Sequence, residues 1–427
     1  MKILVLTRAS WSSDNNTGNT MNNIFSCFPN VELHNVYLRS ELPKNNPCRT
    51  IYRISEQQLI KSVLKRNKCG EIVVNGVDSK QETDKEAARY SKAKKMKFFF
   101  PWFVREAIWS LGKWKHKNFE QYLQEISPDI IFMPVFSCWY PCKVLSYVQK
   151  ITGAKVVLFH TDDNYTLKQY SLSPLYWLYR FTLRKWVRKI EKISSLDYAI
   201  SDMQCKEYSK AFKKDIKILY KGQAFDKMPE IKQPSKTIKM VFTGNISAGR
   251  YQSLALIGQA INKINAENKN VKKIELDIYT KTPMTKKMQK MLTVDGINLM
   301  GGVSADKVME IQRNADILVH AEAFDIKNKL LVRQSFSTKI VDYLYNAKCV
   351  FAVGPSDIAS VDYLIKNDAA IVASSKKTVE AELRKIVENP DLICEYSIKA
   401  WECGMKNHQI EKIQENLYKD FKTLLEK

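Results

Sequence analysis

Short apolar runs alternate with helical segments along most of this chain, and this alternation limits the possible folds more than any other feature. The run KILVLT (2–7) precedes a polar loop that contains glycine, and MNNIFSCF (21–28) then has helical character. Further apolar or β-branched runs occupy residues 129–135, 154–160 and 198–201. Strands that are apolar through most of their length are typical of parallel sheets covered on both faces. The first half therefore predicts a doubly wound α/β domain.

A second series of the same kind follows a segment that contains proline. The text KMPEIKQPSK (227–236) combines two prolines with several charges, which is typical of a linker. A strand, a glycine loop and a helix then follow in VFTGNISAGRYQSLALIGQAI (241–261), and further strand–helix pairs come after them. We therefore expect an α/β protein with two doubly wound domains, 1–230 and 236–400, that face each other across a ligand cleft.

The net charge and the cysteine content indicate which kinds of binding partner and which cellular compartment to expect. The chain has 68 Lys and Arg against 45 Asp and Glu, a net charge of +23 that favours phosphates, nucleic acid or acidic lipids. Its nine cysteines are scattered, and CWYPC (138–142) lacks a second pair, so we expect reduced thiols and no metal site. The apolar run 3–6 is too short for a signal peptide, and no stretch approaches the ~20 apolar residues of a membrane span. We therefore expect a cytoplasmic protein.

One lysine stands where a helix is expected to begin. The stretch RQSFSTKIVDYLYNAKCVFAVGP (333–355) has the pattern of a loop, a helix and a strand, with Lys339 in the first helical turn. Ile340, Val341 and Leu344 recur at helical spacing and would form the buried face. A helix N-terminus carries partial positive charge, so a lysine there is mildly unfavourable unless an anion binds beside it. The stretch therefore predicts an anion site.

Three segments of the second half resemble the donor-binding domain of retaining GT-B glycosyltransferases, in particular their large family four. They are residues 241–261, GGVSADKVMEIQRNADILVHAEAF (301–324) and SFSTKIVDYLYNAKCVFAVGP (335–355), whereas the first half matches in pattern only. The resemblance implies the GT-B fold, two Rossmann-like domains, with residues 401–427 as a helix that packs towards the first. It implies a hexosyltransferase that uses a nucleotide sugar and retains configuration, in bacterial surface polysaccharide synthesis.

The resemblance also implies roles at the donor site. The anion beside Lys339 would be the diphosphate of the nucleotide sugar, and Arg250 would reach it from the glycine loop. Two protein cations would stabilise the charge that develops on the leaving diphosphate, so no metal and no cofactor are expected. The residues expected to bind donor and nucleotide are Gly244, Arg250, Ser304, His320, Glu322, Ser337, Thr338, Lys339 and Asp342.

The sequence departs from the family pattern at one pair of positions, and two of the expected donor-site residues have alternative structural roles. The family commonly carries two glutamates eight positions apart, and Gln334 and Asp342 take their places here. Asp342 can still accept hydrogen bonds from a ribose, whereas the Gln334 amide supplies no charge near the donor sugar. Ser304 could equally be the N-cap of the next helix, and His320 could be a satisfied, partly buried histidine.

The acceptor is expected in the first domain. The stretch LFHTDDNY follows a predicted strand, so we expect His160, Asp162 and Asp163 to project into the cleft. His160 and Asp162, with Gln334, are the expected catalytic residues, because a histidine beside carboxylates can activate a hydroxyl. Asp163 is expected to bind the acceptor, together with Asn19 and Thr20 of the first loop. A strand-end loop of ordinary polar residues is the alternative.

Two segments of the first half combine cations with aromatic residues, at 91–117 and 170–193. This mixture suits an anionic membrane surface, so we expect a peripheral protein at the inner face of the cell membrane with a saccharide or lipid-linked acceptor. Core helices with solvated basic faces are the alternative. RNA binding is a weaker one, because no nucleic-acid-binding motif is present. The function could also be that of a silent GT-B-like partner subunit, motivated by Gln334, or of a nucleotide-sugar epimerase.

Overall fold

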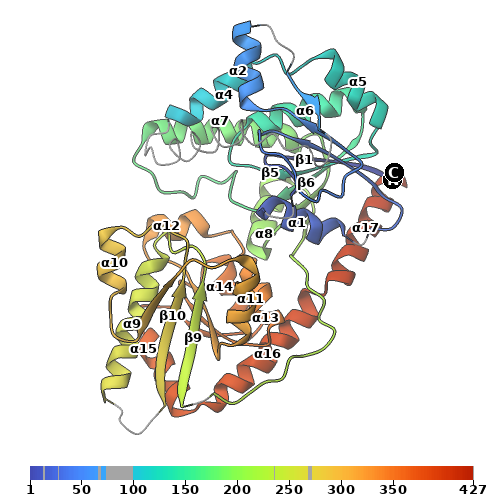
Figure 1. Cartoon of the computed structure of the whole chain (residues 1–427). Helices are drawn as coiled ribbons and strands as arrows, with labels where there is room; N and C mark the ends of the chain where they lie inside the picture. The colour runs from blue at the N-terminus through green and yellow to red at the C-terminus, as the bar shows by residue number, and fades with distance from the viewer. Residues whose placement is uncertain are drawn as a thin grey trace. The chain divides into compact units, whose positions relative to one another are not determined.

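The computed structural model describes residues 1–12, 15–26, 28–65, 69–73, 100–234, 236–267 and 272–426. The chain divides into two compact units (Figure 1). Unit 1 comprises Met1–Leu167, Ser171–Leu219 and Glu411–Lys427, and unit 2 comprises Lys168–Tyr170 and Tyr220–Ile410. The units thus divide before the proline segment 227–236, which lies in unit 2, and residues 91–99 of the first basic–aromatic segment fall outside the described residues.

Unit 1 is built around a sheet with the strand order β4-β3-β2-β1-β5-β6-β7-β8. All neighbouring strands are parallel except β3 and β4, which pair antiparallel. Its elements are β1 (Lys2–Thr7), α1 (Asn16–Phe25), β2 (Glu32–Tyr37), β3 (Thr50–Arg53), α2 (Glu56–Lys65), β4 (Glu71–Ile72), α4 (Phe100–Leu111), α5 (Lys117–Ile126), β5 (Ile130–Val135), α6 (Tyr140–Thr152), β6 (Lys155–His160), α7 (Pro174–Glu191), β7 (Ser194–Ala199), α8 (Asp202–Phe212), β8 (Ile216–Ile218) and α17 (Ile410–Glu426).

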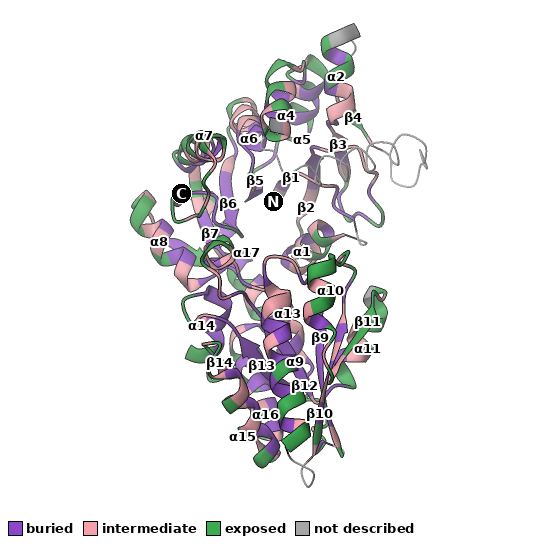
Figure 2. Ribbon diagram, turned by 90° about the vertical axis from the view of Figure 1, so that its left-hand side faces the viewer, coloured by how far each residue is buried: buried purple, intermediate pink, exposed green. Residues whose placement is uncertain are grey.

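Helices cover both faces of this sheet, so its central strands are buried on both sides (Figure 2). Every residue of β5 is buried, as its sequence IIFMPV predicts. The C-terminal helix α17 packs in the same unit, where Phe421 is fully buried and the Gln414 side chain donates to the carbonyl oxygen of Asn23 at 2.7 Å. Among the helices that the structure describes, none combines the length and apolar character needed to cross a membrane.

The first helix begins earlier than the sequence predicts. The Asn15 side chain caps it by accepting from the Gly18 backbone N–H at 2.8 Å. Gly18 is required there because a Cβ atom would lie 1.9 Å from the Ser12 carbonyl oxygen. Asn19 and Thr20 therefore belong to α1 and not to the first loop, which corrects the prediction.

Unit 2 has a fully parallel sheet with the order β11-β10-β9-β12-β13-β14. The strand order reverses between β9 and β12, which is the topological switch point of a doubly wound sheet. Its elements are β9 (Thr237–Thr243), α9 (Arg250–Glu267), β10 (Lys273–Tyr279), α10 (Lys286–Leu292), β11 (Ile297–Gly301), α11 (Ala305–Arg313), β12 (Ile317–Ala321), α12 (Ile326–Val332), α13 (Lys339–Tyr345), β13 (Cys349–Val353), α14 (Ala359–Lys366), β14 (Ile371–Ala373), α15 (Val379–Glu388) and α16 (Asp391–Asn407). The predicted α/β class with two doubly wound parallel sheets is confirmed.

Candidate functional site

A cavity of about 290 Å³ opens at the switch point of unit 2, beyond the carboxyl ends of β9 and β12. Doubly wound sheets bind ligands at this place because the loops on either side of the reversal diverge. The residues that line the cavity are Phe242, Asn245, Arg250, Val319, His320, Ala321, Phe336, Ser337, Thr338, Lys339 and Tyr343. Five of the nine predicted donor-site residues are among them: Arg250, His320, Ser337, Thr338 and Lys339.

Lys339 is the first residue of α13, and its side chain extends to the end of β9. Its ammonium Nζ donates to the Thr243 carbonyl oxygen at 2.8 Å and stands 5.5 Å from the centre of the Phe242 ring. A Cβ atom on Gly244 would lie 1.7 Å from this Nζ, and Gly244 has a φ of +136°, which side chains rarely adopt. Glycine is therefore needed there for space and for conformation.

Burial and the positive charge of Arg250 lower the pKa of Lys339 to about 8. The carboxylates of Glu322 and Asp342 act in the opposite direction. A lysine in this state carries its charge at neutral pH at a cost in free energy. A bound anion would remove that cost, so the surroundings of Lys339 favour an anionic ligand.

Arg250 opens α9 and forms an ion pair with Glu322, which follows β12. Its Nε lies 3.2 Å from Glu322 Oε2, and its Nη2 lies 3.0 Å from Glu322 Oε1. The Glu322 side chain is 3% exposed, and the Ser253 hydroxyl donates to its carbonyl oxygen at 2.6 Å. Burial raises the pKa of Glu322, while the adjacent Arg250 opposes that rise. Glu322 is thus placed to hold the guanidinium at the cavity wall.

His320 lines the cavity as a neutral group. Burial lowers its pKa to about 3, and the charges of Arg250 and Lys339 act in the same direction. Its Nε2 lies 3.0 Å from the Ser360 hydroxyl. Two cations, one carboxylate and a neutral imidazole leave this group with one net positive charge, which suits a ligand that carries phosphate.

Two further predicted donor-site residues, Asp342 and Ser304, and the predicted catalytic residue Gln334 are not among the residues that line the cavity. Asp342 accepts a hydrogen bond from Lys221 Nζ, and it also accepts from the Gln223 amide at 3.2 Å. The Gln334 side chain is fully buried and does not line the cavity. Ser304 occupies the N-cap position of α11, without a cap hydrogen bond from its side chain. The predicted roles of these three residues stay predictions.

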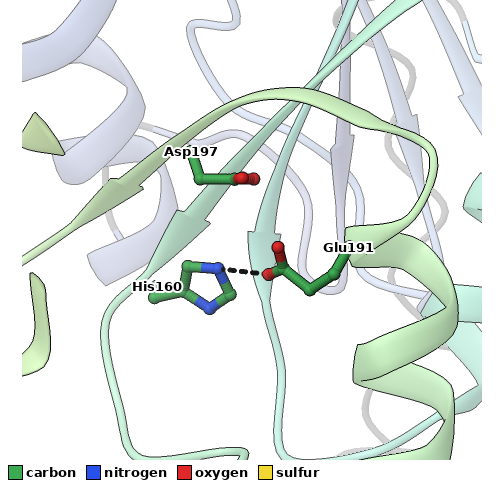
Figure 3. A group of neighbouring side chains, drawn as sticks. All are labelled: His160, Glu191 and Asp197. Atoms are coloured by element: carbon green, nitrogen blue, oxygen red, sulfur yellow. Dashed lines mark ion pairs between the residues drawn. The ribbon is translucent and has the colours of Figure 1, made fainter. Parts of the chain in front are cut away.

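The expectation that His160 projects outward is wrong. Its side chain is fully buried at the end of β6, and its Nε2 lies 2.9 Å from Oε1 of Glu191, at the end of α7 (Figure 3). Asp197 of β7 completes a group whose ligand atoms lie within 4.8 Å of one another, the one such group of metal-ligand type that the described residues contain.

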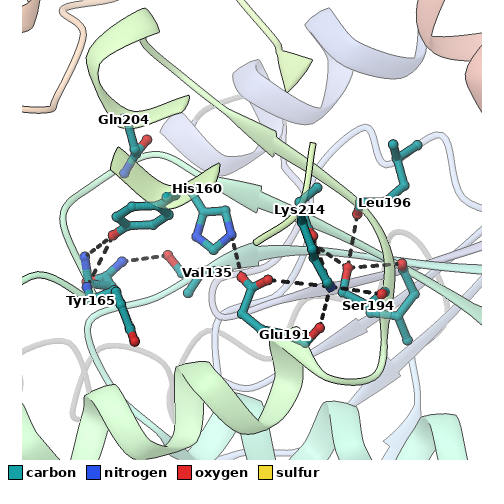
Figure 4. A network of polar contacts seen from close by, with 12 residues as sticks. Val135, His160, Tyr165, Glu191, Ser194, Leu196, Gln204 and Lys214 are labelled. Carbon is teal, nitrogen blue, oxygen red and sulfur yellow. Dashed lines mark hydrogen bonds and ion pairs between the residues drawn. The ribbon is translucent and has the colours of Figure 1, made fainter. Parts of the chain in front are cut away.

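Lys214 supplies the cation of this buried cluster. Its Nζ lies 3.2 Å from Asp197 Oδ2 and 3.6 Å from Glu191 Oε2, and it donates to the Ser194 carbonyl oxygen at 3.0 Å (Figure 4). Burial and the charge of Glu191 raise the pKa of Asp197. The cluster ties the end of α7 to β6 and β7, so the geometry favours a structural role for these residues, and the predicted catalytic role of His160 has no support here.

The two aspartates after β6 differ in their surroundings. Asp163 is buried and pairs with Arg180 of α7 at 2.9 Å, and its Oδ1 accepts from the Thr166 backbone N–H at 2.8 Å. Its predicted projection into open space is therefore wrong, because these groups occupy its carboxylate. Asp162 is exposed, as is Asn19 on α1, and Thr20 donates to the Asn16 carbonyl oxygen at 2.9 Å.

The remaining lining residues were not predicted. Asn245 directly follows Gly244, and its Oδ1 accepts from the Ser247 backbone N–H at 2.6 Å. Phe336 precedes the predicted site helix and packs 5.0 Å from the ring of Tyr363. The sequence offered one indication of their role: Asn245 follows Gly244 directly, and Phe336 lies three residues before Lys339.

Solved structures share this architecture over the whole chain. Anabaena HepE in complex with UDP matches with a TM-score of 0.64 at 11% identity, over 99% of this chain and 100% of that chain. Sucrose-phosphate synthase from Thermosynechococcus elongatus matches with a TM-score of 0.63 at 8% identity, over 99% of each chain. The trehalose-6-phosphate synthase OtsA matches with a TM-score of 0.58 at 10% identity, also over 99% of each. The chain therefore has the GT-B fold, as predicted.

The sequence itself has no such matches. No protein-family model and no curated protein matches it.

Proposed function

We propose that this chain is a glycosyltransferase that moves a hexose from a nucleotide sugar to a saccharide or lipid-linked oligosaccharide, with retention of configuration. The observation that carries the proposal is the cavity at the switch point of unit 2, where Lys339 and Arg250 converge. Its GT-B fold adds support, and HepE, which shares this fold, has been solved with UDP and with UDP-glucose. Uracil nucleotides are therefore the first donors to test.

In the proposed reaction, the acceptor hydroxyl oxygen bonds to the anomeric carbon while the bond from that carbon to the β-phosphate oxygen breaks. The hydroxyl proton passes to the leaving phosphate, and the nucleoside diphosphate departs. Lys339 and Arg250 stabilise the charge that grows on the diphosphate, more in the transition state than in the bound substrate. Glu322 holds Arg250 in position through its two ion-pair contacts.

The proposed setting is bacterial surface polysaccharide synthesis at the cytoplasmic face of the cell membrane. It rests on the resemblance of residues 240–355 to family four and on the basic–aromatic character of 170–193. Asp162 is the proposed catalytic residue on the acceptor side, because it is the exposed carboxylate after β6.

Calorimetric titration with UDP, GDP, ADP and TDP tests the donor site. We expect one nucleotide to bind, and Lys339→Met to weaken it by about 1.5–3 kcal/mol, the value of a hydrogen bond to a charged group. Lys263→Met is the matched control, because Lys263 is a half-exposed α9 lysine that pairs with Glu380 outside the cavity. The proposal would be contradicted if the wild type bound no nucleotide, or if Lys339→Met and Lys263→Met bound it with equal affinity.

A further inference from the structure

Helix α7 of unit 1 presents a face of mixed character to solvent. Its inward side packs in the core through Leu183, Val187 and Ile190, and it also buries the charged residues Arg180 and Glu191. On the outward face of the first half, Leu175, Leu178 and Phe181 are 49%, 56% and 53% exposed. They recur every three residues, which keeps them on one side of the helix. An apolar stripe of this kind is costly in water and points to a contact surface.

The same outward face becomes basic in the second half of the helix. Lys185, Arg188 and Lys189 are exposed there, and Lys192 follows at the C-cap. The one acidic residue within α7 is Glu191, which is buried in the cluster with His160. The face therefore changes along its length from apolar to cationic, over about 16 Å between Leu178 and Lys189 at 1.5 Å per residue.

Two further exposed apolar residues lie next to α7. Leu172, just before the helix, is 87% exposed. Trp102 of α4 is also exposed, and its ring stands edge-on, with its centre 5.0 Å from the ring centre of the buried Tyr179 of α7. An exposed tryptophan is typical of the boundary between lipid headgroups and acyl chains.

We propose that this face of α7, with Leu172 and Trp102, docks on an anionic lipid bilayer. The apolar half enters the boundary between headgroups and acyl chains, which interfacial helices reach to a depth of about 5–10 Å. The basic half then lies among the lipid phosphates, where charge complementarity holds it. The change of character along the axis fits a tilted helix that crosses from one layer to the other. A protein groove, by contrast, would need apolar anchors along the whole helix.

Vesicle co-sedimentation of the full chain tests this surface. One variant replaces Leu175, Leu178 and Phe181 with serine, and a second replaces Lys185, Lys189 and Lys192 with glutamine. The control replaces Lys286, Lys287 and Lys290 of α10, which are also exposed, with glutamine. Vesicles of phosphatidylcholine alone are compared with vesicles that also contain phosphatidylglycerol.

We expect the wild type to bind the anionic vesicles far more tightly than the neutral ones. A basic residue near an anionic surface contributes about fivefold, so the second variant should bind about 100-fold more weakly. The serine variant should lose affinity for both kinds of vesicle. Because the chain has eight tryptophans, entry of Trp102 is reported by the part of the blue shift of emission on binding that Trp102→Phe removes. The α10 control should bind like the wild type.

Three outcomes would overturn the inference: no binding of the wild type, an equal loss in the α10 control, or full binding by the serine variant. RNA binding that needs the α7 lysines but not the apolar residues would assign the face to nucleic acid instead. Lipid binding is measured without nucleotide, and glycosyl transfer can be measured with a water-soluble acceptor. Failure of this surface is therefore distinguishable from failure of the proposed function.

Discussion

Replacing Lys339 with methionine should stabilise unit 2 while it weakens nucleotide binding. The folded protein lowers the pKa of Lys339 from 10.5 to about 8. Because a tenfold change in a proton-binding constant corresponds to about 1.36 kcal/mol, the whole decrease would cost about 3 kcal/mol. The ammonium is only partly buried, which reduces this cost, and methionine also gives up the hydrogen bond to Thr243, worth about 1 kcal/mol. We expect a net gain of about 1–2 kcal/mol at pH 7.

The gain has a defined pH dependence. Below pH 8 the lysine is charged in both states, so the folded wild type bears the full cost. Between pH 8 and 10.5 the folded state releases its proton before the unfolded state does, and the stability of the wild type rises. The advantage of Lys339→Met should therefore shrink across this window and vanish above it.

Denaturant unfolding of fluorotryptophan-labelled protein can follow this unit alone. Trp401 is the single tryptophan between residues 220 and 410, so its fluorine signal reports on unit 2. Nucleotide at 100 times the wild-type Kd should add about 2.7 kcal/mol to the wild type and only about 0.3–1.3 kcal/mol to the variant, whose affinity is about 13- to 160-fold lower. A variant that is less stable than the wild type at pH 7, or a gain that does not change with pH, would show that the Lys339 ammonium does not destabilise the folded protein.

Three further predictions concern single residues. Gly244→Ala should destabilise unit 2 by about 1–3 kcal/mol and weaken nucleotide binding, because the added Cβ would displace the Lys339 side chain. Thermal unfolding measures the loss of stability, and calorimetric titration measures the loss of affinity. Glu322→Gln should lower the pKa of Lys339 further, because the Glu322 carboxylate raises it. Nucleotide titrations at several pH values should then show the affinity falling from a lower pH than in the wild type. An unchanged pH profile of the affinity would contradict this prediction. Burial raises the pKa of Glu106 from 4.5 to about 7, so folded unit 1 binds the extra proton and loses up to about 3 kcal/mol as pH rises across that window. Glu106→Gln should flatten that dependence in denaturant unfolding, and an unchanged slope would show that Glu106 does not cause it.

The sequence predicted the parts of the fold that depend on local pattern. The apolar runs became β5 (Ile130–Val135) and β6 (Lys155–His160), each within one residue of the predicted bounds. Lys339 lies in the first turn of α13, as predicted, because the apolar spacing that marks a helix is visible in sequence. The N-cap was not predicted from the sequence. Asn15 caps α1, so the helix begins at Asn16, upstream of the predicted start at residue 21.

The failures involve partners that are distant in the sequence. His160 and Asp163 look like strand-end residues that face open space. Each is instead buried against a charged group of α7, Glu191 for His160 and Arg180 for Asp163. No local pattern shows that a later helix will supply these partners. Polar residues after a strand are therefore weaker evidence for a site than a glycine that a lysine must approach.

Proton NMR of a UDP-sugar mixed with the protein and a saccharide acceptor tests whether the chain is a retaining glycosyltransferase. We expect the wild type to consume the donor and to form a product with the anomeric configuration of the donor, and Lys339→Met to do neither. Consumption with inverted configuration would contradict retention. A wild type that binds nucleotide yet turns over no UDP-, GDP-, ADP- or TDP-sugar, with any saccharide acceptor tried, would contradict the claim that the chain is an enzyme.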